Sequence, residues 1–161
     1  MRLAIVVLED EPAVREAIER DLDMFADMVR IEPAEDVPDA REVVAEIDAD
    51  GDLLALVLAD HRLPGESGVD FLVELASSPE HSSVRTVLVT GQAGLEDTVR
   101  AVNEAGLDHY IAKPWDDEEL VATVREQLTE FVLANDLDPL PHLRALDGPR
   151  VMQIVRRRPD R

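Results

Sequence analysis

The stretch LLALVLAD, residues 53–60, is an apolar run of seven residues that stops on an acid. A short run without polar interruption is typical of a strand buried on both faces, as in a parallel sheet. A second run, LAIVVL at 3–8, has the same character and is followed by Glu9, Asp10 and Glu11. The two runs together predict a parallel sheet whose strands end at carboxylates.

Weaker strand patterns and amphipathic stretches alternate with these two runs along the chain. Pro12 suits a first helical position, and Gly106 is suited to ending a helix. Alternation of this kind predicts an α/β fold, with a parallel sheet covered by helices on both faces. The expected strands are 3–8, 29–33, 53–59, 86–90 and 109–112, and the expected helices are 12–28, 38–49, 68–77, 95–105 and 116–134.

Composition excludes several classes of site. The chain has no cysteine, which rules out disulfides and thiolate chemistry, and its four histidines show no metal-binding spacing. A formal charge of −20 disfavours direct nucleic-acid binding, and no apolar run approaches the length of a membrane span. We expect a soluble cytoplasmic protein that binds neither nucleic acid nor membrane.

The residues that follow the strands carry the candidate chemistry. In an open α/β sheet, sites form outside the carboxyl ends of the strands. Glu9 and Asp10 follow the first run, Asp60 follows 53–59, Thr90 ends 86–90 and Lys113 follows 109–112. Two carboxylates about 4 Å apart repel by roughly 4 kcal/mol at an effective dielectric constant of about 20. A bound cation relieves that repulsion, and ligands that are all oxygen favour Mg²⁺.

Each of these residues also has an ordinary structural interpretation. Glu9 and Asp10 are common as a solvated helix start, Asp60 as a turn former before Pro64-Gly65, and Thr90 as a strand end. Lys113 is the only lysine among 16 basic residues, and one lysine must fall somewhere. Compatible chemistry at four strand ends together favours a functional site.

Four stretches then identify a family. The chain resembles the receiver domain of two-component response regulators over residues 1–134, with 135–161 as a C-terminal extension. The matching stretches are VVLEDEP (6–12), LVLADHRLPGESG (56–68), VLVTG (87–91) and DHYIAKPW (108–115). The resemblance implies a flavodoxin-like (βα)5 fold, which is a doubly wound parallel five-stranded sheet with strand order 2-1-3-4-5.

The resemblance also implies roles for individual residues. Asp60 would accept a phosphoryl group from a sensor histidine kinase or a phosphotransfer protein. Glu9, Asp10, Asp60 and the backbone carbonyl of Arg62 would hold Mg²⁺. Lys113 would contact a phosphoryl oxygen, with a cis Lys113–Pro114 peptide directing its side chain into the cleft.

The response to phosphorylation would pass through Thr90 and Tyr110. The Thr90 hydroxyl would move toward the phosphoryl group, and the Tyr110 ring would turn inward. The response surface would be the face of helix 95–105, strand 109–112 and the last helix, which would control a partner or an output domain. Arg62 and Gln92 occupy the positions that tune loss of the phosphoryl group in receivers.

Some residues depart from the family pattern or lie outside its motifs. Glu9 stands where receivers often have Asp, and its longer side chain still reaches the ion. Gly91 follows Thr90 where Ala or Ser is usual. We expect His61 to be exposed and without a role, and Trp115 to serve in packing.

The tail, residues 135–161, leaves two alternatives open. It holds six arginines and four aspartates, a net charge of +2, and is too short for a DNA-binding domain with its own core. The first alternative is a structural role, as a short helix packed on the body or a frayed end. The second is a functional role, as a docking or dimerisation segment or the start of an output domain. A homodimer is therefore one option for the assembly.

Three functions compete at this level. The first is a phospho-acceptor switch, which is no enzyme beyond self-catalysed phosphotransfer and autodephosphorylation. The second is a small hydrolase with Asp60 as nucleophile, like phosphatases of the haloacid dehalogenase type. Those enzymes carry Asp-x-Asp after their first strand, whereas Arg62 lies two positions after Asp60. The third is a degenerate receiver that acts only as a protein-binding scaffold, which would have no need of the complete set of site residues.

Overall fold

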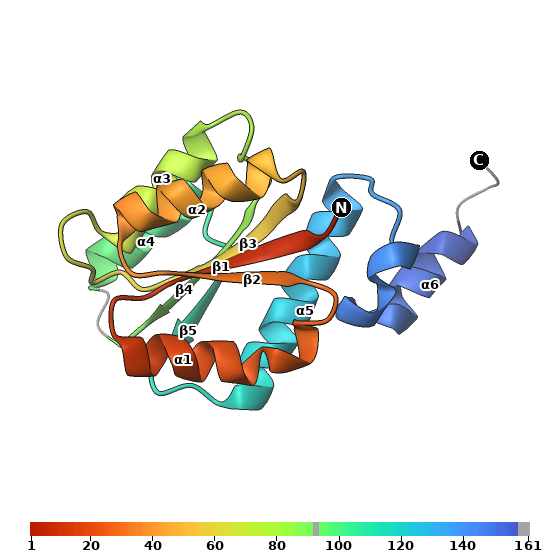
Figure 1. Ribbon diagram of the computed structural model, residues 1–161, viewed down its shortest axis with the longest axis horizontal. Helices are drawn as coiled ribbons and strands as arrows, with labels where there is room; N and C mark the ends of the chain where they lie inside the picture. Colours follow the sequence, from red (N-terminus) through yellow and green to blue (C-terminus); the bar gives the residue numbers. More distant parts are fainter. Residues whose placement is uncertain (92–93, 158–161) are drawn as a thin grey trace.

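The computed structural model describes residues 1–91 and 94–157, and its centre is one parallel sheet (Figure 1). The strand order is β2-β1-β3-β4-β5, which confirms the expected order. Each strand lies within one residue of the range that the sequence predicts. The strands are β1 (Leu3–Leu8), β2 (Arg30–Ala34), β3 (Leu53–Ala59), β4 (Arg85–Thr90) and β5 (His109–Ala112).

Five helices cover the sheet on both faces, as Figure 1 shows. They are α1 (Pro12–Asp21), α2 (Val37–Ala49), α3 (Gly68–Ser77), α4 (Leu95–Ala105) and α5 (Asp117–Ala134). Alternate residues of β1 divide between two cores: Ile5 packs with residues of α1 and α5, whereas Val6 packs with residues of α2, α3 and α4. Burial on both faces explains why β1 and β3 are uninterrupted apolar runs.

Local signals set the helix boundaries. The Asp36 side chain accepts a hydrogen bond from the Asp39 N–H at the start of α2, and Ser67 and Asp70 cap α3 reciprocally. Gly106 ends α4 in the left-handed conformation, at φ 64°, where a side chain would be strained. These caps place the loops before α2, α3 and β5.

The predicted helix 12–28 is too long, because α1 ends at Asp21. A 3₁₀ turn, η1 (Asp23–Phe25), follows it. Leu22 and Phe25 are fully buried, and a 3₁₀ turn places residues three apart on the same side. Phe25 also lies beneath the Arg125 guanidinium, 5.1 Å from the ring centroid. Burial of both side chains thus takes precedence over continuing the helix.

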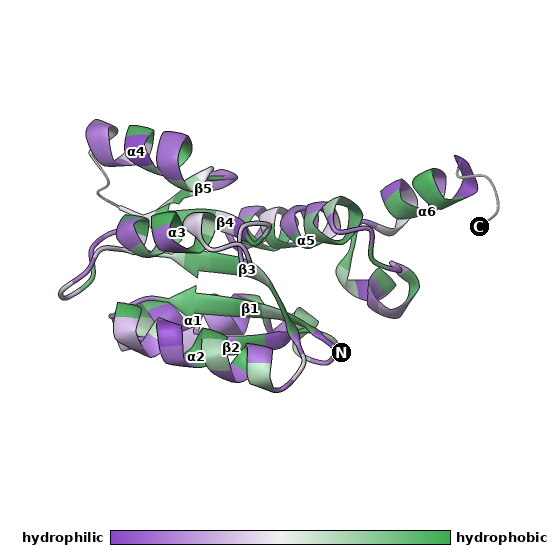
Figure 2. Ribbon diagram, turned by 90° about the horizontal axis from the view of Figure 1, so that it is seen from above, coloured by the Kyte–Doolittle hydropathy of each residue, from purple (hydrophilic) through white to green (hydrophobic). Residues whose placement is uncertain are grey.

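The tail forms a 3₁₀ segment, η2 (Leu140–Ala145), and a final helix, α6 (Gly148–Arg157). Ala145, Leu146 and Val151 are buried in the same core as α5. Beyond this contact α6 extends away from the sheet, as both ribbon views show (Figures 1 and 2). Among the described residues, no helix is long and apolar enough to cross a membrane.

Candidate functional site

The carboxyl ends of the four strands β1, β3, β4 and β5 meet at one edge of the sheet. Leu8 pairs with Ala59, and Thr90 pairs with Ala112. The residues that follow these strands therefore share one rim. The structure gathers the predicted residues Glu9, Asp10, Asp60, Thr90 and Lys113 there; their functional roles stay predictions.

Lys113 joins two of the carboxylates. Its Nζ lies 2.7 Å from Glu9 Oε1 and 3.0 Å from Asp60 Oδ2. Its side chain is 19% exposed, and that of Glu9 is 2% exposed. The Lys113–Pro114 peptide bond is cis. The ammonium therefore neutralises acids that the fold has largely removed from water.

A cleft of about 400 Å³ opens at this rim and gives solvent access to the acids and the ammonium. Ligands the size of a phosphoryl group can enter a space of this kind. It is lined by Asp10, Glu11, Asp60, Arg62, Thr90, Gly91 and Lys113.

The carboxylates at the cleft differ in their affinity for protons. Burial raises the pKa of Glu9 to about 7, although Lys113 acts in the opposite direction. Burial also acts to raise the pKa of Asp60, but the neighbouring side chains of Glu9, Thr90 and Lys113 together hold it below its ordinary value. Asp60 is therefore ionised at neutral pH, as a nucleophile must be.

The acids at this rim fit a divalent cation. One carboxylate oxygen from each of Glu9, Asp10 and Asp60 lies within 4.8 Å of the other two. Glu9 Oε2 is buried and has no hydrogen-bond partner among the described residues. An unsatisfied buried carboxylate oxygen is costly, and a cation satisfies it. The donors are all oxygens, which suits Mg²⁺.

Arg62 and Gln92 are the two residues predicted to tune loss of the phosphoryl group. Arg62 lines the cleft, and its backbone N–H donates to Asp60 Oδ1 at 3.4 Å. Its backbone carbonyl as a metal ligand stays a prediction. Gln92 lies outside the described residues.

Thr90 and Tyr110 are in contact. Thr90 is 1% exposed, and its side chain forms a hydrogen bond with Asp60. The Tyr110 hydroxyl donates to the Thr90 backbone carbonyl at 3.4 Å, and its half-buried ring packs against the core beneath α4. A chain of contacts thus runs from Asp60 through Thr90 to β5.

The expectation that His61 is exposed is wrong, whereas its lack of a functional role stays a prediction. Its side chain is only 14% exposed, and its Nε2 lies 3.1 Å from Asp97 Oδ2 in the first turn of α4. The sequence carries no signal for this contact, because Asp97 is 36 positions away in the chain. His61 links the loop after Asp60 to α4.

Gly68 is a site residue that the strand-end argument misses. A Cβ atom at this position would lie 1.8 Å from the backbone oxygen of Asp60. The Gly68 N–H also donates to the His61 carbonyl at 3.1 Å. Only glycine allows the start of α3 to approach the loop of the acceptor so closely.

Trp115 has the packing role that we expect. Its ring packs against the core formed with α1 and α5. Its Nε1–H donates to Asp21 Oδ2 at 2.7 Å. The contact fixes the end of α1 to the segment that precedes α5.

Comparison with known proteins gives one consistent result. The family described as response regulator receiver domain matches residues 5–125. The hydrogenase transcriptional regulatory protein HoxA of Cupriavidus necator is 31% identical over 137 residues, which are 84% of this chain and 26% of HoxA. The phosphate regulon transcriptional regulatory protein PhoB of Escherichia coli is 34% identical over 127 residues, 78% of this chain and 51% of PhoB. The chain thus spans a quarter to a half of the length of these relatives.

Solved structures show the same fold. The signal receiver domain of an HD domain-containing protein from Pseudomonas fluorescens Pf-5 superposes with a TM-score of 0.72 at 24% identity, covering 81% of this chain and 98% of that one. A CheY-like response regulator receiver domain protein from Methanospirillum hungatei JF-1 gives 0.70 at 25% identity, covering 83% and 99%.

Proposed function

The chain belongs to the response regulator receiver domain family, and from this premise we propose that it is a phosphorylation-activated switch in which Asp60 accepts the phosphoryl group. The donor is the phosphohistidine of a sensor kinase or of a phosphotransfer protein. One observation carries the proposal: the ionised Asp60 carboxylate lies in an open cleft, 3.0 Å from the only lysine of the chain.

The transfer needs an in-line attack and little other covalent chemistry. An Asp60 carboxylate oxygen attacks phosphorus, the P–N bond to the donor histidine breaks, and the released imidazole nitrogen keeps the electron pair of that bond. The Lys113 ammonium stabilises the negative charge on the phosphoryl oxygens. Mg²⁺ held by Glu9, Asp10, Asp60 and the Arg62 carbonyl supplies further charge neutralisation. The chain is then no enzyme beyond its own phosphotransfer and autodephosphorylation.

The side chain at position 113 has to be compact. Lysine brings a point charge on a flexible stem, and its Nζ reaches both Glu9 and Asp60. A guanidinium is planar and wide, and it is best satisfied by a bidentate partner. A chain that otherwise uses arginine for every basic residue keeps lysine here for that reason.

The signal leaves the cleft through Thr90 and Tyr110. When Asp60 carries the phosphoryl group, the Thr90 hydroxyl turns toward a phosphoryl oxygen. This movement vacates space, and the Tyr110 ring, whose hydroxyl contacts the Thr90 backbone carbonyl, fills it by turning inward. The output face is formed by α4, β5 and α5, and Val99 and Val102 are about half exposed on α4. A cytoplasmic partner or output domain binds this face.

The receiver unit extends over residues 1–134, and 135–161 is an extension. The relatives HoxA and PhoB are named as transcriptional regulatory proteins, and they are longer than this chain. Control of an output of that kind is part of the proposal. The chain itself carries a charge of −20, which opposes direct contact with nucleic acid.

Intact-mass spectrometry tests the proposal directly. After incubation with a small phosphodonor and Mg²⁺, the chain should gain the mass of one phosphoryl group. Asp60→Asn should abolish the gain. Asp27→Asn is the matched control, because it removes an exposed acid that does not line the cleft. This variant should keep the gain in mass. A folded wild-type chain that gains no mass would favour the scaffold alternative.

A further inference from the structure

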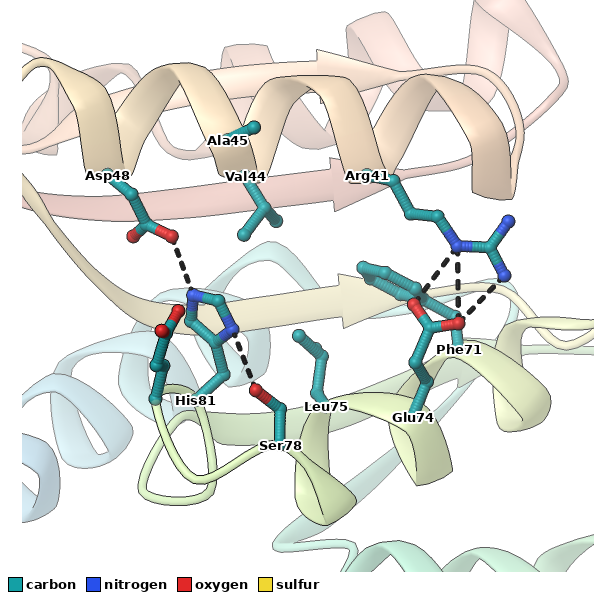
Figure 3. A pocket seen from close by; sticks show the side chains of 10 residues that line it. Arg41, Val44, Ala45, Asp48, Phe71, Glu74, Leu75, Ser78 and His81 are labelled. Atoms are coloured by element: carbon teal, nitrogen blue, oxygen red, sulfur yellow. Dashed lines mark hydrogen bonds and ion pairs between the residues drawn. The ribbon is translucent and has the colours of Figure 1, made fainter.

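A histidine and two carboxylates lie together at the edge of the sheet where the strands begin, away from the acidic cleft. Asp48 is in the last turn of α2, and Glu80 and His81 lie in the loop between α3 and β4. One ligand atom from each lies within 4.8 Å of the other two. Figure 3 shows His81 facing Asp48 across the groove between α2 and α3. The fold thus joins residues 32 positions apart in one mixed nitrogen and oxygen cluster.

Both ring nitrogens of His81 contact a neighbouring side chain, and the two contacts orient the imidazole. Nε2 lies 2.8 Å from Asp48 Oδ2, and Nδ1 lies 3.4 Å from Ser78 Oγ (Figure 3). When Nδ1 carries the proton and donates it to Ser78, Nε2 offers its lone pair to the cluster. This is how metal-binding histidines are commonly held, with the second nitrogen hydrogen-bonded to a neighbour.

The cluster has both a fixed part and an adjustable part. The His81 side chain is 15% exposed and is held by its surroundings, whereas the Asp48 side chain is 43% exposed. Metal–ligand bonds of about 2.0 Å at tetrahedral angles place ligand atoms roughly 3.3 Å apart. A small rotation of the exposed carboxylates accommodates that spacing.

Two cavities give access to the cluster. One, of about 360 Å³, lies between α2 and α3 over Val44, Phe71 and Leu75. The other, of about 250 Å³, lies beside β3 and the tail. Asp48, Glu80 and His81 line both of them. A hydrated cation can therefore reach these ligands from two sides without any change in the fold.

We propose that Asp48, Glu80 and His81 bind a divalent transition-metal cation, for which Zn²⁺ is the reference ion. An imidazole nitrogen selects against Mg²⁺, which prefers oxygen ligands, and in favour of transition metals such as zinc, copper and nickel. Three protein ligands with water in a fourth position complete a tetrahedral site. The ion binds Nε2 of the neutral imidazole, and the single N–H of the ring is then at Nδ1, where it is donated to Ser78 Oγ.

Such an ion ties the end of α2 to the loop after α3. It does so at the opposite edge of the sheet from Asp60, and the inference does not rest on phosphorylation. Because the ligands come together only in the folded chain, the ion stabilises the fold by linkage. Saturating Zn²⁺ should therefore raise the melting temperature.

Zinc titration of the full chain in the Asp60→Asn background, followed by NMR of the histidine side-chain nitrogens, tests the site. We expect one Zn²⁺ per chain, a shift of the His81 resonances, and no competition from excess Mg²⁺. His81→Gln should remove both the binding and the rise in melting temperature. Ser78→Ala should weaken zinc affinity about tenfold, because it removes only the contact that orients the ring.

His109→Gln is the matched control, because it removes a histidine that lines neither cavity. It should leave zinc affinity unchanged. Equal zinc affinity in the Asp60→Asn chain with and without His81→Gln would overturn the proposal. Shifts at His61, His109 or His142 in place of His81 would do the same, and so would the absence of any binding.

Discussion

At the scale of single residues, Lys113 is the most sensitive position of the acidic cleft. Its Nζ contacts both Glu9 and Asp60 as a point charge, whereas a guanidinium is planar, wider and best satisfied by a bidentate partner. Lys113→Arg should fold and bind Mg²⁺ but should slow phosphorylation of Asp60 at least about tenfold, which corresponds to roughly 1.4 kcal/mol in the barrier. Stopped-flow phosphorylation with a small donor measures this rate. A wild-type rate in Lys113→Arg would refute the reason given for the lone lysine.

His61 is a second residue whose substitution should have a measurable effect. Its contact with Asp97 connects the acceptor loop with α4, which carries part of the proposed output face. His61→Ala should leave the phosphoryl gain intact while reducing the NMR shift changes that phosphorylation causes in α4. Asp97→Asn should have a similar effect. Unaltered responses of α4 in both variants would remove His61 from the signalling path.

Gly68 ends the stretch 56–68 that resembles receivers, but the strand-end rule predicts no role for this glycine. The strand-end rule locates acids, hydroxyls and the ammonium because it concerns where parallel strands finish. Gly68 and the His61–Asp97 contact depend on how a loop folds back on a helix. Hydrophobic periodicity does not predict such a contact between a loop and a helix. The distance between the two segments is known only from the three-dimensional structure.

At the scale of elements, the start of α3 is fixed by its approach to the acceptor loop. Gly68→Ala places a methyl group 1.8 Å from the Asp60 carbonyl oxygen, so the backbone has to move. We expect a loss of more than about 3 kcal/mol in the free energy of unfolding, measured in urea. Gly148→Ala, where nothing lies within 4 Å of the added atom, should change it by less than about 0.5 kcal/mol. Equal stabilities for the two variants would contradict the close approach.

The η2 segment carries a histidine whose burial makes stability depend on pH. Burial, aided by the positive N-terminus, lowers the pKa of His142 from its ordinary value, although Asp138 acts against this. The unfolded chain therefore binds a proton at a higher pH than the folded chain, and stability decreases as pH falls below the ordinary histidine value. His142→Gln should lose less stability than the wild-type chain between neutral and mildly acidic pH, measured by urea unfolding. Parallel pH profiles for the two chains would contradict this interpretation.

The elements themselves were largely predictable. Buried strands are visible as apolar runs because both faces are covered, and α4 ends at the glycine that the sequence suggests. The helix predicted to Met28 fails for a tertiary reason, because Leu22 and Phe25 are both buried through a 3₁₀ turn. Helical periodicity alone does not distinguish that turn from a further turn of helix.

At the scale of the whole molecule, the tail belongs to the packing of the receiver. Ala145, Leu146 and Val151 cover α5, and the Arg125 guanidinium donates to the carbonyls of Arg144 and Leu146. The sequence left open whether this segment, with two prolines and a basic cluster, is a short helix or frayed end on the body, or a segment for docking, dimerisation or output. In the structure Val151 of α6 is buried, and the helix extends outward from the sheet.

Removal of residues 138–161 tests that packing. The truncated chain should lose roughly 3–5 kcal/mol of unfolding free energy, because three apolar residues leave the core and their partners on α5 become exposed. Phosphorylation of Asp60 should persist in the chains that remain folded, because the acidic cleft lies at the other edge of the sheet. Urea unfolding and intact mass measure the two effects. A truncated chain as stable as the full one would show that the tail does not support the core.

The most direct test of the central claim is to locate the phosphoryl group within the phosphorylated chain. Peptide mapping by mass spectrometry, after treatment with a small phosphodonor and Mg²⁺, identifies the modified residue. We expect a single modified peptide in which Asp60 carries the group. A phosphoryl group on a different acid, or an unmodified Asp60 in a folded chain that binds Mg²⁺, would contradict the proposed switch.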